Sequence, residues 1–230
     1  MVHITHLHPW NVTYHDAVNI QQELRQNLIL HDEDFPGQIN TVAGADISYA
    51  KQDDLFFAAV VLMDFSSMTI MEERTAVARA PFPYIPGLLS FREGPVLLKA
   101  FEKLHHIPDV VIFDGQGIAH PRGIGLASHM GLFLNIPTIG CAKKRLVGHY
   151  GTVGSDAGDY AELTFNDRAV GAVLRTKKKI KPVFVSPGHM IGIRKSVEIV
   201  LQCCRVYKLP EPTRRAHLAV NRIRQSVSSC

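Results

Sequence analysis

The chain has 230 residues, enough for one good-sized domain and marginal for two, and 46% of them are hydrophobic, so a substantial core can be buried. Its 25 Lys and Arg residues against 21 Asp and Glu give a net charge of +4, which fits a nucleic-acid enzyme without requiring one. No run reaches the roughly 18 apolar residues that a membrane helix needs, and Met1 to Trp10 lacks the apolar core of a signal peptide. We therefore expect a single domain over residues 1–230 that has no membrane partner.

Cysteine and histidine usage narrows the compartment and the metal chemistry. The cysteines are Cys141, Cys203, Cys204 and Cys230, and no pair of them has the spacing of metal ligands. Such a set is typical of a chain kept in a thiol-reducing cytoplasm. The 12 histidines are scattered, so no tract binds metal by composition alone. Because no segment has the pattern of a dimer seam, we expect a cytoplasmic monomer.

The first 80 residues predict one helix and three strands. Thr13 can cap a helix over Tyr14–Leu30, with Asp16 at its third position. Three strand-like runs with short polar turns between them, at 51–54 and 66–67, are Thr41–Tyr49, Leu55–Asp64 and Met68–Ala76. Consecutive strands with short links predict an antiparallel meander.

After a Pro-rich loop at Pro81–Gly87, the chain alternates between helices and strands. We expect a helix over Pro95–His105 and a buried parallel strand over Asp109–Asp114, an apolar run bounded by Pro108 and Gly115. The other expected elements are a helix at Gly125–Leu134, strands at Pro137–Cys141, Tyr160–Phe165, Ala169–Arg175 and Val183–Ser186, and helices at Lys195–Cys204 and Thr213–Gln225. This order predicts an α/β fold with a mixed central sheet, an antiparallel meander and then parallel strands, flanked by helices. It resembles the layout of the ribonuclease H-like fold, which many metal-dependent nucleases share, although a fold alone does not give a function.

Asp46 is a carboxylate in an unfavourable place, among the small apolar residues of the first predicted strand. A buried acid is costly unless a cation or hydrogen-bond donors compensate it, and strands disfavour Asp. A lone Asp in a strand more often lies on a solvated face or is satisfied by a turn. For Asp46 taken alone, that interpretation stays the more common one.

Asp114 ends the expected parallel strand and is followed by Gly115-Gln116-Gly117. Ligand sites in open α/β sheets form at the carboxyl ends of strands, and glycines there keep the backbone out of a ligand's way. The alternative is an Asp that caps a turn. Taken with Asp46, however, two carboxylates on neighbouring central strands would repel each other. A divalent cation such as Mg²⁺ removes that repulsion, and paired sites of this kind hydrolyse phosphodiesters.

Glu93 stands just before Gly94-Pro95 and allows two interpretations. Ser90 to Glu93 matches a capping box, in which the glutamate only satisfies a backbone donor. That box would start the helix earlier and leave Pro95 in its second turn, a poor place for proline. With Pro95 at the first helical position, Glu93 is instead a free carboxylate at the mouth of the helix, and we favour this interpretation.

Two single residues gain interest only beside the aspartates. His217 lies on the last predicted helix, where a lone histidine is usually a surface or satisfied core residue. If that helix packs against Asp46 and Asp114, a neutral imidazole could ligate or orient a metal-bound water. Lys143 follows a predicted strand, together with Lys144 and Arg145, and could hold a phosphate.

Two loops have a composition that is suited to binding nucleic acid. The prolines of Pro81–Gly87 stiffen Tyr84 and Ile85, and a rigid apolar wedge of this kind can separate stacked bases. A Pro-rich turn tucked against the core would have the same sequence. The small residues of the loop Ile118–Gly125 could line a base pocket close to Asp114.

Six short strings in order resemble a known family, the endonuclease V or deoxyinosine 3′-endonuclease family. They are Val42–Asp46, Pro83–Gly87, Phe91–Glu93, Asp114–Gly117 with Ala119–Arg122, Ile139–Lys143 and Ser186–His189. Each string is weak alone, and their order makes the match specific over about Val12 to Gln225. The resemblance implies the ribonuclease H-like fold and a Mg²⁺ site that Mn²⁺ can also fill.

The resemblance also assigns roles by position. Asp46 and Asp114 are implied to bind the metal, Glu93 to be the third acid, and His217 to complete the site, with Lys143 near the scissile phosphate. The implied strand-separating wedge is Pro83, Tyr84, Ile85 and Pro86. For the lesion-base pocket we expect Gly115, Gly117, His120 and Gly125.

The implied reaction is a repair nick. The family hydrolyses the second phosphodiester bond on the 3′ side of a deoxyinosine and leaves 3′-hydroxyl and 5′-phosphate ends with the base in place. Some relatives act on inosine in single-stranded RNA, so RNA stays an alternative substrate. A ribonuclease H-like nuclease with another target, a small-molecule phosphohydrolase and a non-catalytic inosine-binding module are the competing functions. The last needs the acids to be dispensable, and a phosphohydrolase would leave the wedge unexplained.

Overall fold

A computed structural model describes residues 2–33, 35, 37–50, 55–80 and 82–228, and within them all strands form one mixed sheet in the order β3-β2-β1-β4-β5-β8-β7-β6. The strands are β1 (Thr41–Ala50), β2 (Leu55–Asp64), β3 (Ile70–Arg79), β4 (Val110–Phe113), β5 (Thr138–Ala142), β6 (Tyr160–Phe165), β7 (Arg168–Leu174) and β8 (Val183–His189). The helices are α1 (Tyr14–Leu24), α2 (Leu89–Phe101), α3 (Leu126–Leu134), α4 (Ile193–Cys203) and α5 (Glu211–Ser228), with a short 3₁₀ helix η1 (Arg25–Asn27). None of these helices combines the length and the apolar character needed to cross a membrane.

The strand directions confirm the predicted α/β class. β1 pairs antiparallel with β2 and β2 with β3, whereas β1, β4 and β5 run parallel. The sheet then returns to antiparallel pairing from β5 through β8 and β7 to β6. Consequently β1, β4 and β5 have their carboxyl ends at the same edge of the sheet.

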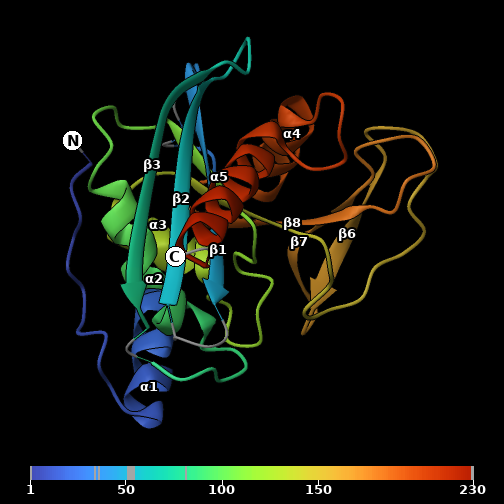
Figure 1. Cartoon of the computed structure of the whole chain (residues 1–230). Coiled ribbons are helices and arrows are strands. Elements are labelled where there is room, and N and C mark those ends of the chain that lie inside the picture. Colours follow the sequence, from blue (N-terminus) through green and yellow to red (C-terminus); the bar gives the residue numbers. More distant parts are fainter. Residues whose placement is uncertain (1, 34, 36, 51–54, 81, 229–230) are drawn as a thin grey trace.

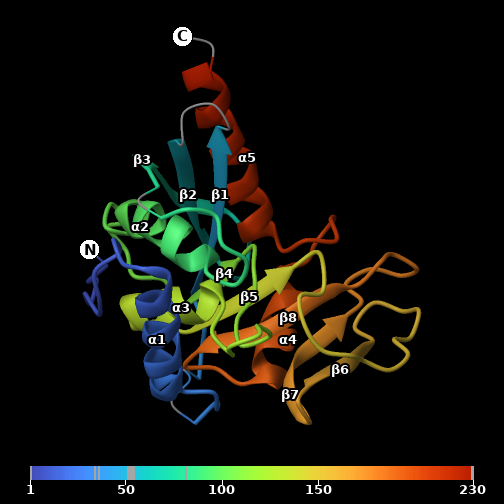
Figure 2. The same ribbon diagram turned by 90° about the horizontal axis from the view of Figure 1, so that it is seen from below.

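Helices cover both faces of the first half of the sheet (Figures 1 and 2). α2 and α3 lie on one face and α5 on the other, with α4 packed behind β8. The side chains of β2 divide accordingly: Phe56 and Leu62 join the core under α2 and α3, and Phe57 and Met63 join the core under α5. Burial on both faces explains why β2 is an unbroken apolar run rather than an alternating one.

The start of α2 differs from the prediction. The helix begins at Leu89, not at Pro95, and Pro95 lies inside it. Phe91, Leu98 and Phe101 are buried along one face of the helix. This apolar burial outweighs the one backbone hydrogen bond that the proline removes. The capping box is also absent, because no side chain caps the helix at Leu88.

Other boundaries move by a few residues. α1 ends at Leu24 rather than at Leu30, and η1 begins at the next residue, Arg25. The predicted cap of Thr13 with Asp16 is present. β3 starts at Ile70 because Met68 takes a left-handed turn conformation at φ 55°. The predicted turn at 51–54, Pro81 of the Pro-rich loop and Cys230 lie outside the described residues, and Cys141, Cys203 and Cys204 are free thiols.

Candidate active site

The parallel register brings the two aspartates together. Ala45 of β1 pairs with Phe113 of β4, so the next residue on each strand, Asp46 and Asp114, lies at the same level. The backbone N–H of Asp114 donates to the Ala45 carbonyl at 3.3 Å, which continues the ladder to this point. Lys143 directly follows β5, the next parallel strand, and therefore lies at the same sheet edge. The neighbourhood expected from the sequence is present.

α5 places His217 over Asp46. The helix begins against Gly44, where a Cβ atom would stand about 2.0 Å from the Pro212 backbone carbon, so only glycine allows this close approach. One helical turn beyond Thr213, His217 Nδ1 lies 2.7 Å from Asp46 Oδ2. On the other side of the ring, the Asn221 side-chain amide lies 3.0 Å from His217 Nε2. The histidine is therefore held from both sides and directs one nitrogen at the carboxylate.

The acids at this edge are incompletely compensated. Burial raises the pKa of Asp46, and the nearby Asp114 carboxylate raises it further, against the hydrogen bond from His217. Lys143 Nζ donates to Asp114 Oδ2 at 2.6 Å. Burial acts to lower the pKa of Lys143, but this bond and the Asp114 charge outweigh it, and the pKa is raised. One cationic side chain and one imidazole thus face the carboxylates.

Glu93 reaches the same cleft from the opposite face of the sheet. It lies in α2, and it shares a cleft of about 220 Å³ with Asp46 and Asp114. Burial raises the pKa of Glu93 to about 8, and the charge of Asp46 adds to the shift, while Arg92 opposes it. Glu93 is therefore a carboxyl in the site and not a helix cap, as predicted, although the helix starts before it.

The carboxylates fit a Mg²⁺-type ion rather than a preformed metal cage. In the part of the chain that the structure describes, no three His, Cys, Asp or Glu side chains are arranged to hold a metal ion by themselves. Mg²⁺ is commonly bound by only one or two carboxylates, with phosphate oxygens and water as the other ligands. Asp46 and Asp114 supply that pair, and the repulsion that raises the pKa of Asp46 is what a divalent cation relieves.

A larger pocket adjoins the acidic cleft and unites the two predicted loops. Its volume is about 410 Å³, and it shares the side chains of Leu89 and Leu126 with the cleft. The predicted residues that line it are Tyr84, Ile85, Pro86, Gly115, His120 and Gly125. Pro83 and Gly117 are not among the lining residues. A Cβ atom at Gly117 would meet the Pro187 carbonyl oxygen at 2.0 Å, so this glycine permits close backbone packing.

The Pro-rich loop is anchored at its end. Tyr84 has an exposed fraction of 67%. Gly87, at φ 80°, presents its carbonyl to two donors, Gln21 Nε2 at 3.1 Å and Arg122 Nη2. Arg122 also donates to Gln21 Oε1. These bonds join α1, the Pro-rich loop and the loop after β4, so Tyr84 projects from a fixed base.

His120 is a neutral group in the pocket wall. Burial lowers its pKa to about 4, the positive charge of Arg122 lowers it further, and a hydrogen bond with the Gly87 backbone opposes both. The Arg122 backbone N–H lies 3.2 Å from His120 Nδ1 and donates to it. The ring thus helps to fix the loop that carries Arg122.

Several residues at the site were not predicted from the sequence, among them Asn221, Gln21 and Ser90. Asn221 follows His217 by four residues, a spacing that puts both on one helix face and could have revealed it. Gln21 had no visible signal, because its partners Gly87 and Ile124 are 66 and 103 residues away. Ser90 was considered only as a helix cap, yet it lines the pocket.

The chain is similar to one family of known proteins. The family model described as Endonuclease V matches residues 22–218. A curated relative, the endonuclease V of Dehalococcoides mccartyi, is 47% identical over 218 residues, which cover 95% of this chain and 97% of the relative.

Solved structures agree with the sequence match. The endonuclease V of Streptomyces avermitilis superposes with a TM-score of 0.90 at 38% identity and covers 99% of both chains. The endonuclease V of Ciona intestinalis, in complex with a 24mer DNA that contains an inosine followed by a ribo-adenosine, has a TM-score of 0.83 at 26% identity, covering 93% of this chain and 98% of that one. These likenesses confirm the predicted ribonuclease H-like fold.

Proposed function

This chain belongs to the endonuclease V family, and on that premise we propose that it is a single-domain, monomeric, metal-dependent repair endonuclease that nicks DNA beside a deoxyinosine. One observation carries the proposal. The cleft that holds Asp46, Glu93 and Asp114 adjoins the pocket behind Tyr84, and the two share Leu89 and Leu126. A hydrolytic centre and a cavity of base-binding size therefore lie side by side.

Asp46 and Asp114 are the residues that would hold Mg²⁺, and Mn²⁺ is expected to substitute for it. When bound, such an ion supplies an activated water and stabilises the leaving oxygen of a phosphodiester. Glu93 completes the acidic edge from α2. Its raised pKa keeps a proton on it at neutral pH as long as the two aspartates remain uncompensated.

His217 and Lys143 act on the aspartates directly. His217 donates from Nδ1 to Asp46 and thereby fixes the orientation of that carboxylate. Lys143 donates to Asp114 and lies close enough to the cleft to turn towards a phosphate oxygen. In that position the Lys143 ammonium group would stabilise the negative charge that develops during hydrolysis.

The Pro83–Pro86 segment is proposed to separate the strands, and the pocket to receive the extruded base. Tyr84 is exposed but its loop is anchored through the Gly87 carbonyl, so the aromatic ring can enter the base stack without a large ordering cost. Gly115 and Gly125 leave the pocket wall to backbone atoms. Hypoxanthine lacks the exocyclic amines of adenine and guanine, so a closely packed wall can reject both of those bases.

The cut is proposed at the second phosphodiester bond on the 3′ side of the lesion, with 3′-hydroxyl and 5′-phosphate products. Resemblance to the family supports this position. The structure is compatible with it, because the acidic cleft and the base pocket are separate cavities that share one wall. A phosphate at the cleft would thus belong to a nucleotide other than the one whose base is extruded.

RNA is the second candidate substrate. The related Ciona intestinalis protein was crystallised with an inosine followed by a ribo-adenosine, so a 2′-hydroxyl is present on the nucleotide after the inosine in that complex. We therefore include inosine-containing single-stranded RNA beside DNA in the test of function.

The test is cleavage of end-labelled DNA and RNA strands that carry one inosine or one adenine at the same position, with Mg²⁺ or with a chelator. We expect one cut beyond the nucleotide after the inosine, absent with Asp46→Ala and with chelator. Asp156→Ala changes an exposed acid and should cleave normally. Ligation and polymerase extension identify the product ends. Tight inosine binding without any cut would favour the non-catalytic binding module instead.

A further inference from the structure

A chain of hydrogen bonds runs from the N-terminal segment to the wall of the base pocket. His8 Nε2 lies 2.7 Å from His129 Nε2, and His129 Nδ1 lies 2.8 Å from Ser90 Oγ. His129 is fully buried in α3, and Ser90, which lines the pocket, is buried in α2. The chain therefore links a half-buried imidazole to the hydroxyl of a residue in the wall of the pocket.

The position of the proton in each hydrogen bond of this chain follows from the position of the proton on His8. His8 Nδ1 lies 2.9 Å from the Pro9 carbonyl oxygen, which can only accept, so His8 carries its proton on Nδ1. A neutral imidazole has one N–H, so His8 Nε2 is bare and accepts from His129 Nε2. His129 Nδ1 is then bare and accepts the hydroxyl proton of Ser90. Ser90 Oγ has only lone pairs left for the pocket.

This proton arrangement requires both imidazole rings to be neutral, and their surroundings keep them neutral. Burial lowers the pKa of His8, against the bond to Pro9, and lowers that of His129 far below its usual value. The rings of Trp10, Phe91 and Phe133 surround the two imidazoles at centroid distances of 4.6–5.6 Å, and none of these rings carries a charge.

We propose that Ser90 is a specificity-determining residue, a pure hydrogen-bond acceptor that reads the ring N–H which deamination creates on a purine. This rests on the proposed function of the pocket. Adenine has a bare N1 at its pairing edge, whereas hypoxanthine has N1–H. An acceptor at Ser90 therefore pairs with hypoxanthine and faces a lone pair of adenine. His129 and His8 are positioning residues, because they act only through the Ser90 proton.

Ser90 does not exclude guanine, which also carries N1–H, so exclusion of guanine is left to the space around its exocyclic amine. Gln116 is the competing acceptor in the same pocket. Its Nε2 donates to the Lys144 carbonyl at 3.0 Å, and within the described residues its buried Oε1 has no hydrogen-bond partner. The experiments must therefore separate Ser90 from Gln116.

The first experiment observes the protons directly in the wild-type protein. Long-range ¹H–¹⁵N spectra of ¹⁵N-histidine-labelled protein distinguish protonated from bare ring nitrogens, and loss of signals in His8→Ala and His6→Ala assigns the N-terminal rings. We expect His8 protonated at Nδ1 and His129 at Nε2. His129 protonated at Nδ1 would make Ser90 a donor to the pocket and overturn the proposal.

The second experiment compares the dissociation constants of two DNA strands. One strand carries a single hypoxanthine, and the other carries an unsubstituted purine, which lacks N1–H, at the same position. They are measured in chelator, so no strand is cut. Ser90→Ala should weaken hypoxanthine binding roughly tenfold, the worth of one hydrogen bond in a buried site, and leave the purine strand unchanged. Ser90→Cys, which keeps a weak donor and acceptor, should restore part of the difference. His8→Ala should weaken hypoxanthine binding about threefold, and the exposed neighbour His6→Ala should not.

Three outcomes decide the matter. Equal weakening of both strands by Ser90→Ala would show a packing role only and would overturn the proposal. An unchanged preference in Ser90→Ala, with the preference lost in Gln116→Ala, would transfer the role to Gln116. Failure of the proposed function would give a different result, because the wild-type protein would then show no preference for hypoxanthine over adenine in either DNA or RNA.

Discussion

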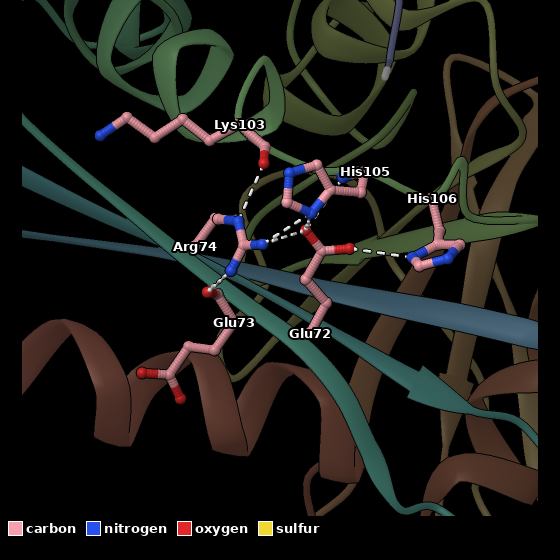
Figure 3. A network of polar contacts seen from close by, with 6 residues as sticks. All are labelled: Glu72, Glu73, Arg74, Lys103, His105 and His106. Carbon is pink, nitrogen blue, oxygen red and sulfur yellow. Dashed lines mark hydrogen bonds and ion pairs between the residues drawn. The ribbon is translucent and has the colours of Figure 1, made fainter.

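Two glutamates lie towards opposite ends of α2 and meet different surroundings. Glu72, on β3, faces the loop that follows the helix and is 4% exposed at its side chain. It accepts from Arg74 Nη2 at 2.8 Å, from the His105 backbone N–H at 2.9 Å and from His106 Nδ1 at 3.2 Å (Figure 3). Burial acts to raise the pKa of Glu72, but these bonds outweigh it and the pKa is lowered. Near the other end of α2, Glu93 faces Asp46 and Asp114, and its pKa is raised to about 8.

The difference separates a structural acid from a functional one. Around Glu72 the protein supplies donors, so the charge is stable without any ligand. Around Glu93 the protein places two more acids, and their repulsion keeps a proton on Glu93 at neutral pH until a cation from outside compensates the charges. A carboxylate that is destabilised in a cleft is a candidate for function, whereas one stabilised by donors is a candidate for folding.

The largest expected effect concerns the acidic cleft. Asp114→Asn removes one of the paired carboxylates, and we expect inosine-strand cleavage to fall by roughly 10³-fold, because metal stabilisation of the transition state is worth several kcal/mol and each 1.36 kcal/mol is tenfold. Single-turnover cleavage measures this. The melting temperature should stay within a few degrees of wild type, since the lost bond to Lys143 is partly exposed and repulsion of Asp46 is relieved. A folded variant with normal cleavage would remove Asp114 from the site.

The next largest effect is a loss of stability on removal of Glu72, the glutamate that is surrounded by hydrogen-bond donors. Glu72→Ala removes the buried carboxylate that accepts from Arg74 Nη2 and from the His105 backbone N–H, and we expect a loss of about 2 kcal/mol in the free energy of unfolding. In a chain of this length that lowers the melting temperature by about 4–8 °C. Cleavage per folded molecule should not change. Reduced cleavage at full stability would show that the network supports the site after all.

Substitution of Glu93 is expected to have a smaller effect on stability, and it should raise the melting temperature instead of lowering it. In metal-free protein at pH 8, Glu93→Gln should raise the melting temperature by roughly 2–4 °C, the shift of about 1 kcal/mol in a chain of this length. The folded-state pKa is raised, so wild type loses stability as pH rises from 4.5 towards 8, and the variant does not. The stability contributed by Glu72 depends on pH in the opposite direction, because its pKa is lowered and its contribution is lost as pH falls below about 4.5. Thermal melts in chelator from pH 4 to 9 test both, and a Glu93→Gln variant that is destabilised at pH 8 would contradict the contrast.

Local patterns predicted those parts of the site that depend on single strands. Asp46 was singled out because an acid among apolar strand residues is costly, and Asp114 because it ends a parallel strand; the parallel register then places them at one level. Lys143 followed from the same rule of strand ends. Asp114 and Lys143 need only their own strand and the sheet order to be placed.

The start of α2 could not be predicted in this way, because it depends on packing. Pro95 argued locally for a helix start, but burial of Phe91 and Leu98 carried the helix through the proline. Contacts between distant segments were equally invisible. His8 bonds to His129 across 121 residues and Gln21 to Ile124 across 103, and nothing in either segment names its partner.

The smallest predicted effect tests how His217 is held. Asn221→Ala removes the partner of His217 Nε2, and we expect cleavage to fall about threefold, since one partly exposed hydrogen bond is lost. Arg222→Ala on the same helix breaks a pair with Glu73 at 2.9 Å and should leave cleavage unchanged. If His217 serves mainly to orient Asp46, the lower rate in Asn221→Ala should follow a loosened imidazole and appear in the single-turnover rate rather than in substrate binding. A faster rate would mean that Asn221 restrains a ring nitrogen needed by water, and would move His217 from orienting Asp46 to positioning the nucleophile.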